Sequence, residues 1–352
     1  MKRKKVTLFA VACLATIFVQ PMALSQAANS PHLVHSNFMS YYPIKGASPS
    51  TASSVAGGVG AVTYQPGGTI ISEPNIYVIW YGNWEAKSCS ARSGTSSTAS
   101  IINDFLGNLG ESAWNRINTT YYQISHGKKT FVQLTGDVQG CTVDQNSQGL
   151  SLDGQTGPQI ADVVDNALST HVLKTDPNGV YVVLTASNVQ VADFMTAFCA
   201  YHGAYDNGQA TIKYAFIGDP SNNLGQCAPQ VSTSPNGNPA ADAMVSAIAH
   251  EFVEAVSDPE GLSWYDQVGF ENADKCAWSY GTATKAANGS FSNMTLGDRQ
   301  YLVQQNVAAN TNICTLTVGN SETQSKQGQQ TDSSHNSSQS EAAHPSHAST
   351  NK

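Results

Sequence analysis

The sequence predicts a single mixed-sheet domain of the α/β or α+β class, flanked by helices and stapled by disulfides. Short runs of β-branched and aromatic residues, typical of buried strands, alternate with stretches of helical periodicity. Six cysteines follow the N-terminal leader, an even number that suits disulfide pairing. We expect the domain to span residues 69–318, which is enough chain for one proper core.

The individual elements follow from the apolar pattern. Strands are expected over residues 76–81, 131–134, 180–184 and 214–217, where β-branched and aromatic side chains are concentrated. Helices are expected over residues 100–109 and 160–172. The second of these helices has one apolar stripe, formed by Ile160, Val163, Val164, Ala167 and Leu168.

The two ends of the chain differ from the domain in composition. Residues 1–27 have the pattern of a signal peptide: four basic residues at positions 2–5 precede an apolar run over 6–19, which is too short to span a membrane. Residues 28–68 are rich in Ser, Gly, Ala and Pro and are expected to form a flexible lead-in, and residues 319–352 a disordered polar tail. The protein is therefore expected to be secreted, with the extracellular space, periplasm or cell surface as its location.

The charge of the exported chain excludes two classes of partner. Removal of the signal peptide leaves 13 basic and 25 acidic residues, a net charge of −12. Nucleic acid and anionic lipid are not attracted to such a surface without a basic patch, and the sequence has none. We expect no nucleic-acid partner and no membrane span.

The cysteines indicate three disulfides in an oxidising compartment. Six cysteines allow fifteen pairings. Proximity along the chain favours Cys89 with Cys141, Cys199 with Cys227, and Cys276 with Cys314.

The strongest chemical signal is a helix that begins at Asn238-Pro239 and ends at Ser257-Asp258-Pro259. Asn is a good N-cap, and Pro suits the first helical position. Polar residues recur every fourth position along this helix and form a stripe opposite the apolar one: Asp242, Ser246, His250 and Glu254.

This helix resembles the H-E-x-x-H helix of zinc peptidases, with Glu254 in place of the second His. His250 and Glu254, one turn apart, can hold zinc, and the adjacent Glu251 can activate a bound water as the catalytic residue. A third ligand is expected in the following loop, where the candidates are Asp258, Asp266, Glu271 and Asp274. We favour Glu271, because glutamate-type zinc peptidases place their third ligand at a similar distance along the chain.

The expected cofactor is one divalent metal ion, with zinc favoured. One His with two carboxylates is an oxygen-rich donor set that also suits calcium, manganese or magnesium. The alternative interpretation is a solvated polar stripe on an amphipathic helix, with the acidic residues of the loop acting as turn residues and helix caps.

Several short stretches occur in order over about residues 60 to 316: Val62-Thr63-Tyr64, Ile79-Trp80-Tyr81-Gly82-Asn83-Trp84, Phe198-Cys199-Ala200-Tyr201-His202-Gly203, Gln226-Cys227-Ala228-Pro229, Ala249-His250-Glu251 and Tyr301-Leu302-Val303-Gln304. Taken together, they are similar to the EXORDIUM or phosphate-induced protein 1 family of secreted proteins. The resemblance implies a protein of the cell surface or wall, a class associated in plants with growth control. The family shares the H-E-x-x-E helix and the acidic segment after it, which is consistent with ligands at His250, Glu254 and Glu271.

Three functions follow as hypotheses. The first is a secreted metal-dependent hydrolase of the peptidase type that acts on an extracellular peptide, with Glu251 as general base. The second is a non-catalytic extracellular protein that binds a cell-wall component, with a structural metal or none, through aromatic side chains such as Trp84. The third is a calcium-stabilised scaffold that uses Asp258, Asp266 and Asp274.

His202 is a further candidate for a ligand or proton donor, since it follows Cys199 by three residues in a segment that a disulfide would fix. A packed, hydrogen-bonded histidine is the alternative. For Trp80, packing in the core at a strand end is expected.

Overall fold

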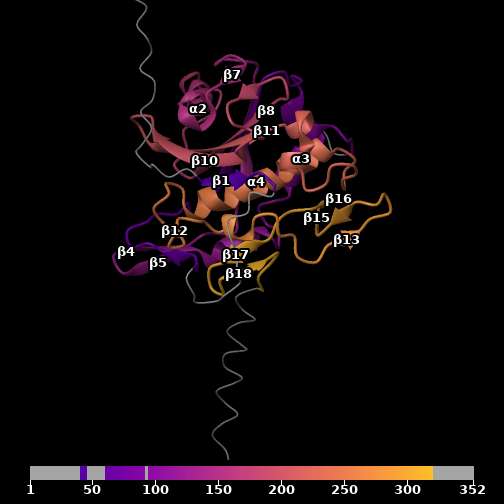
Figure 1. Ribbon diagram of the computed structural model, residues 1–352. Helices are drawn as coiled ribbons and strands as arrows, with labels where there is room; N and C mark the ends of the chain where they lie inside the picture. The colour runs from indigo at the N-terminus through magenta and orange to yellow at the C-terminus, as the bar shows by residue number, and fades with distance from the viewer. Residues whose placement is uncertain (1–39, 46–59, 92–93, 320–352) are drawn as a thin grey trace, which may run out of the picture. The chain divides into compact units, whose positions relative to one another are not determined.

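A six-stranded mixed sheet forms the centre of the protein. The computed structural model describes residues 40–45, 60–91 and 94–319 (Figure 1). The sheet order is β1-β10-β11-β8-β3-β6, with β1 at one edge. The strands are β1 (Ser40–Pro43), β3 (Asn75–Tyr81), β6 (Asp137–Asp144), β8 (Gly179–Thr185), β10 (Phe198–Asp206) and β11 (Thr211–Gly218). The pairs from β11 to β6 are parallel, whereas β10 is antiparallel to both β1 and β11.

The central strands are built from residues that tolerate burial on both faces. Every residue of β8 is buried, and all but the first residue of β3 are. Strands buried in this way read as continuous apolar runs, because neither face meets water. This explains why the predictions over 76–81, 180–184 and 214–217 are confirmed as parts of β3, β8 and β11.

Helices cover both faces of the sheet. The helix α2 (Gln159–Ser169) lies on one face, and α4 (Pro239–Ser257) lies on the other, against β10 and β11 (Figure 1). The helix α1 (Thr98–Gly107) packs beside α4, and the single turn α3 (Leu224–Cys227) lies near its flank. The predicted mixed α and β class is confirmed, and both predicted helices over 100–109 and 160–172 exist with boundaries shifted toward the N-terminus.

Short elements complete the described part of the chain. The two-stranded pairs are β2 (Thr63–Tyr64) with β12 (Trp264–Tyr265), β4 (Tyr122–Ser125) with β5 (Lys128–Phe131), β7 (Ser151–Leu152) with β9 (Gln190–Val191), β13 (Thr284–Lys285) with β14 (Phe291–Ser292), β15 (Met294–Leu296) with β16 (Arg299–Tyr301), and β17 (Asn306–Ala308) with β18 (Ile313–Thr315). The 3₁₀ turns are η1 (Ser88–Ser90), η2 (Asn115–Thr120), η3 (Gly154–Thr156), η4 (Pro220–Asn222) and η5 (Asp274–Cys276).

The strand predicted over 131–134 is displaced. The observed strand β5 ends at Phe131, where it pairs with Tyr122 of β4. His126 and Gly127, both with positive φ, form the turn of this hairpin and therefore fix its register. The prediction was wrong here because the turn, and not the local apolar run, sets the strand boundaries.

The structure also differs from the expected flexible lead-in over residues 28–68. Residues 40–43 of that segment form β1, whose backbone pairs with β10 from Ser40 opposite His202 to Pro43 opposite Phe198. A composition rich in small polar residues does not prevent pairing with an exposed sheet edge, because the backbone supplies the hydrogen bonds. The predicted signal peptide and polar tail lie outside the described residues, except for Gly319.

Three disulfides link the sequence neighbours that proximity favoured. Cys89 pairs with Cys141, Cys199 with Cys227, and Cys276 with Cys314. Such bridges are typical of proteins that fold in an oxidising compartment. In the described part of the chain, none of the helices combines the length and the hydropathy that crossing a membrane requires.

The Cys199–Cys227 bridge should fix β10 in place. It closes a loop with a sequence separation of 28, so replacing both cysteines by Ala should lower the free energy of unfolding by about 3–4 kcal/mol in urea denaturation. Removal of Cys89–Cys141, with a separation of 52, is the matched control. Both changes should destabilise the protein, but only the first should accelerate amide hydrogen exchange in β10. Equal protection of β10 in the two variants would contradict this role.

Candidate metal centre

The polar stripe of α4 is buried, whereas the alternative interpretation of the sequence placed it in solvent. His250, Ser246 and Glu254 are fully buried, and Asp242 is 7% exposed. The helix is buried on all sides because the sheet covers one side, and α1 (Thr98–Gly107), η2 (Asn115–Thr120) and residues 272–274 pack against the others. The interpretation as a solvated stripe is therefore wrong, and the buried polar groups need partners of another kind.

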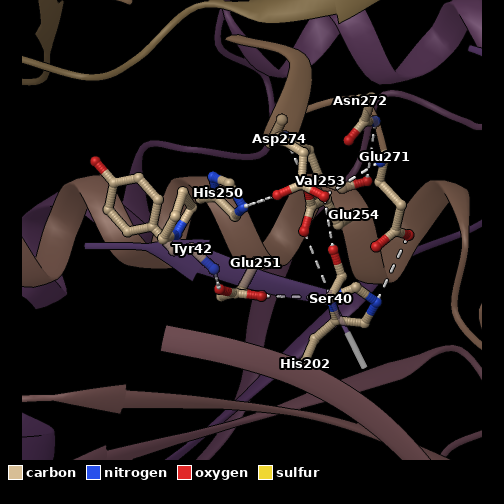
Figure 2. Close-up of polar contacts among 12 residues, drawn as sticks. Ser40, Tyr42, His202, His250, Glu251, Val253, Glu254, Glu271, Asn272 and Asp274 are labelled. Atoms are coloured by element: carbon tan, nitrogen blue, oxygen red, sulfur yellow. Dashed lines mark hydrogen bonds and ion pairs between the residues drawn. The ribbon is translucent and has the colours of Figure 1, made fainter. Parts of the chain in front are cut away.

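The helix itself contributes three side chains to the cluster. Its ends are set by the expected signals, since the Asn238 side chain accepts a hydrogen bond from the Ala241 N–H and Pro239 occupies the first turn. Within the helix, His250 Nε2 lies 3.2 Å from Glu254 Oε1, one turn away. Glu251 is also fully buried. Figure 2 shows these side chains on the side of α4 that faces β1 and β10.

His202 reaches the cluster from the sheet. Its Nδ1 lies 3.3 Å from Glu251 Oε2 and 3.7 Å from Glu254 Oε2, and its Nε2 lies 3.8 Å from Glu271 Oε1 (Figure 2). One imidazole thus faces three buried carboxylates. His202 is buried, as the alternative interpretation expected, but its ring nitrogens face carboxylates of the cluster. His202 therefore belongs to the site.

The loop after α4 supplies two more acids. The Asp274 N–H donates to Glu254 Oε1 at 2.9 Å, which ties the start of η5 to the helix. Asp274 Oδ1 lies 3.5 Å from His250 Nε2, and its Oδ2 accepts the Glu271 N–H at 3.2 Å. Glu271 is fully buried, and neither of its carboxylate oxygens has a hydrogen-bond partner in the described structure.

Two groups of side chains have donor atoms close enough to hold an ion, and they share Glu254. His250, Glu254 and Asp274 form one group, and His202, Glu251 and Glu254 form the other, with donor atoms within 4.8 Å of one another in each. Of the predicted ligands, His250 and Glu254 are brought together. Glu271 lies beside His202 and outside both groups, so its role as a ligand stays a prediction.

The three aspartates of the predicted calcium scaffold do not form a cluster among the described residues. Asp266 pairs with Lys275 Nζ at 2.6 Å, and its other oxygen accepts the N–H groups of Val268 and Phe270. Asp258 Oδ1 accepts the Ser263 N–H at 2.6 Å and shapes the turn after the helix. Of the three aspartates, only Asp274 belongs to either donor group, and Asp258 lies near His202 and Glu271.

Among the described residues, the carboxylates of the cluster have no Lys or Arg partner. In the part of the chain that the structure describes, no Lys or Arg forms an ion pair with these acids, because Lys275 pairs with Asp266 and Arg299 with Asp104. Burial raises the pKa of Glu251 to about 8, and burial together with Asp274 raises the pKa of Glu254 to about 7. Burial and the neighbouring Glu254 raise the pKa of Glu271 well above its usual range.

The two imidazoles respond in opposite directions. Burial alone would lower the pKa of His250, but Glu254 and Asp274 outweigh it and hold the pKa well above the ordinary value. Burial lowers the pKa of His202, despite the opposing effect of Glu254 and Asp258. Ionised carboxylates are thus disfavoured in this site unless protons or a positive charge, such as that of a protonated His250, balance them.

Sequence reasoning missed the contribution of β1. Ser40 Oγ donates to Asp274 Oδ2 at 3.0 Å, and the Tyr42 N–H donates to Glu251 Oε1 at 3.2 Å. No motif marks these residues, because a main-chain amide carries no signal of its contacts. Trp80 is buried in the core as expected, whereas Trp84 is half-buried and donates from its Nε1 to Leu184 O.

Fold and site together define a disulfide-bonded α and β protein with a buried histidine and carboxylate cluster. The family profile described as the phosphate-induced protein 1 conserved region matches residues 62–317. The chain belongs to this family, which confirms the resemblance found in the sequence.

Curated relatives are similar over most of the domain. Protein EXORDIUM-like 5 of Arabidopsis thaliana is 28% identical over 268 residues, which cover 67% of this chain and 69% of the relative. Protein EXORDIUM-like 3 of the same plant is 28% identical over 288 residues, with 68% and 78% covered. Protein PHOSPHATE-INDUCED 1 of Nicotiana tabacum is 23% identical over 296 residues, with 72% and 88% covered. No solved structure gives a significant match.

Without a bound ion, the protein should lose stability as the pH rises from 5 to 8. The raised pKa values of Glu251, Glu254 and Glu271 mean that the folded chain holds protons that the unfolded chain releases above about pH 4.5. The raised pKa of His250 acts in the same direction, and the lowered pKa of His202 opposes it. We expect the free energy of unfolding of chelator-treated protein to fall by on the order of 3 kcal/mol in urea titrations across this range.

The matched control is Glu251→Gln, which removes one titrating group and should flatten this dependence. Added divalent ion should stabilise the wild-type protein more at pH 8 than at pH 5, because ion binding displaces the retained protons. A stability that rises with pH in the chelated protein would contradict this account.

Proposed function

We propose that this protein is an extracellular metal-dependent hydrolase of the peptidase type. The proposal rests on one observation, a buried cluster in which imidazole and carboxylate donors converge and with which no Lys or Arg of the described residues forms an ion pair. The family names of its relatives supply no reaction, so the chemistry of the cluster carries the argument.

A divalent cation fits the donors that are present. His250 Nδ1 is buried without a hydrogen bond in the described structure, and Glu254 Oε2 has no partner closer than His202 Nδ1 at 3.7 Å. Such orphaned groups are costly unless something else satisfies them. His250, Glu254 and Asp274 would hold the ion, with Glu271 as the further predicted ligand. We favour zinc, and calcium is the alternative for so oxygen-rich a set.

When bound, such an ion polarises a substrate carbonyl and lowers the pKa of a water molecule. Glu251 serves as the general base and acid. Its carboxylate is held between the Tyr42 N–H and His202 Nδ1, which orients it toward the cluster. In hydrolysis the peptide C–N bond breaks, the carbonyl carbon takes the hydroxyl of water, and Glu251 passes the proton of that water to the leaving amine.

A second candidate function is a non-catalytic extracellular protein with a structural ion. The complete burial of His250, Glu251, Glu254 and Glu271 favours it, because a substrate needs access to a catalytic ion. Binding of a cell-wall component through Trp84 gains less support, since this side chain is half-buried and its Nε1 is occupied.

Elemental analysis combined with a broad peptide-library digest separates these functions. Wild-type protein should carry one divalent ion per chain, and His250→Ala should lose most of it. Glu251→Gln should keep the ion but reduce peptide hydrolysis by about 10²–10⁴-fold, the range for loss of a general base. If the ion is structural, Glu251→Gln should keep its normal metal content and no sample should hydrolyse peptides. Wild-type protein without a bound metal would remove the basis of the proposal.

A further inference from the structure

Strand β1 covers the cluster from the edge of the sheet. It pairs antiparallel with β10, the strand that carries His202, and Ser40 lies opposite His202 in the register. Its contacts are directed at the groups proposed to do the chemistry: Ser40 Oγ donates to Asp274 and the Tyr42 N–H donates to Glu251. Figure 2 shows Ser40 and Tyr42 beside the acids of the site.

The side chains of β1 alternate as expected for a strand on a surface. Ser40 and Tyr42 are buried, whereas Tyr41 between them is 44% exposed. The Tyr42 ring lies against His250, with ring centroids 4.6 Å apart. A small polar residue thus faces Asp274, and an aromatic residue two positions later covers His250.

Main-chain groups of β1 are recognised from both sides. Its ladder with β10 uses one edge of its backbone, and the Glu251 carboxylate accepts the Tyr42 N–H on the side of α4. A ladder and a carboxylate that accepts a backbone amide can receive any extended polypeptide, whatever its side chains. This is the geometry of recognition by strand addition.

Trp278 packs against β1 and holds it in this position. Its ring stacks on Tyr42 with centroids 4.7 Å apart, and its Nε1 donates to Pro43 O at 3.0 Å. Trp278 has a φ of +62°, a left-handed backbone conformation that is unfavourable for so bulky a residue. Strain of this kind is retained where the surrounding structure requires it and is often found at functional sites.

The family match gives an independent reason to separate β1 from the rest of the sheet. The matched region begins at residue 62, and β1 is the one strand of the central sheet that lies outside it. The strand β10, the helix α4 and all the candidate donors lie inside it. The occupied edge is therefore part of the family domain, whereas its occupant precedes that domain.

We propose that the edge of β10 is the binding position for an extended polypeptide substrate and that β1 occupies this position within the same chain, so that the site is closed. This inference names the substrate class and the regulation of the proposed hydrolase and rests on it for catalysis. The strand-binding edge itself does not depend on catalysis. By the pattern of β1, the preferred peptide has a small residue facing Asp274 and an aromatic residue two positions later.

The test cuts the folded chain beside β1, so that β1 is no longer covalently joined to the rest of the sheet. A recognition sequence for a specific protease, inserted within residues 46–59, allows cleavage of the purified full-length protein after folding. The probe is a fluorescent peptide with the sequence of residues 40–45, Ser-Tyr-Tyr-Pro-Ile-Lys, and its binding is followed by fluorescence anisotropy. Cut protein should bind the probe at least about tenfold more tightly than uncut protein, since its own strand no longer has the advantage of covalent attachment.

Two controls test whether probe binding depends on the main-chain amide and on the buried side chains of β1. A probe methylated on the amide nitrogen of its Tyr42 equivalent cannot donate to Glu251 and should bind about tenfold more weakly, the effect of one buried bond to a charged group. In the uncut chain, Tyr42→Ala should admit the probe. Tyr41→Ala, a change of the same type at the exposed neighbour, should not.

The outcomes separate the inference from the proposed function. Hydrolysis of a peptide library that appears only after cutting, with a preference for the small and aromatic pattern, supports both. Probe binding by an ion-loaded but inactive cut chain would keep the inference and remove the hydrolase. Full hydrolysis by the uncut chain would keep the hydrolase and overturn the occupied edge. Unfolding on release of β1, judged by circular dichroism, or equal binding of the methylated probe would also overturn it.

Discussion

The rest of the site depends on the contacts of the Glu254 carboxylate, because its two oxygens face different parts of the fold. Oε1 lies beside His250 and accepts the backbone amide of Asp274, so it joins helix α4 to the loop after it. Oε2 faces His202 of the sheet at 3.7 Å. This side chain is fully buried and has no Lys or Arg partner in the described structure. Sheet, helix and loop can therefore meet here only if protons or a cation balance the charge.

The position of the cluster follows from the change of strand direction in the sheet. In doubly wound parallel sheets, ligands bind beyond the carboxyl ends of the strands. Here β10 and β1 run antiparallel to their neighbours at one edge, and His202 lies within β10 under α4 instead of at a strand end. The donors therefore meet on a face of the sheet that a helix covers. This arrangement explains both their burial and the dominance of burial in raising the carboxylate pKa values.

The sequence was sufficient where local chemistry sets the structure. Asn238 and Pro239 define the start of α4, the i to i+4 spacing places His250 beside Glu254, and each cysteine pairs with the next one along the chain. Long-range pairing lies beyond such reasoning. The approach of His202 depends on the register of β10 against its neighbours, and the choice of Asp274 over Glu271 beside His250 depends on the turn at η5. Strand β1 was missed because its order comes from the edge that it joins.

A buried ion site can be structural or can be an enzyme site in a closed state, and the two differ in what must move to expose it. Access past α4 would require the sheet, α1 and the surrounding core to separate, which approaches global unfolding. Access past β1 requires the loss of a four-residue edge ladder, the bonds of Ser40 and Tyr42 to the acids, and the contacts of Trp278. Each such hydrogen bond contributes only about 0.5–3 kcal/mol. Opening at β1 therefore disrupts fewer contacts than opening past α4, and under the proposal above the edge of β10 is the route by which an extended peptide would reach the donors.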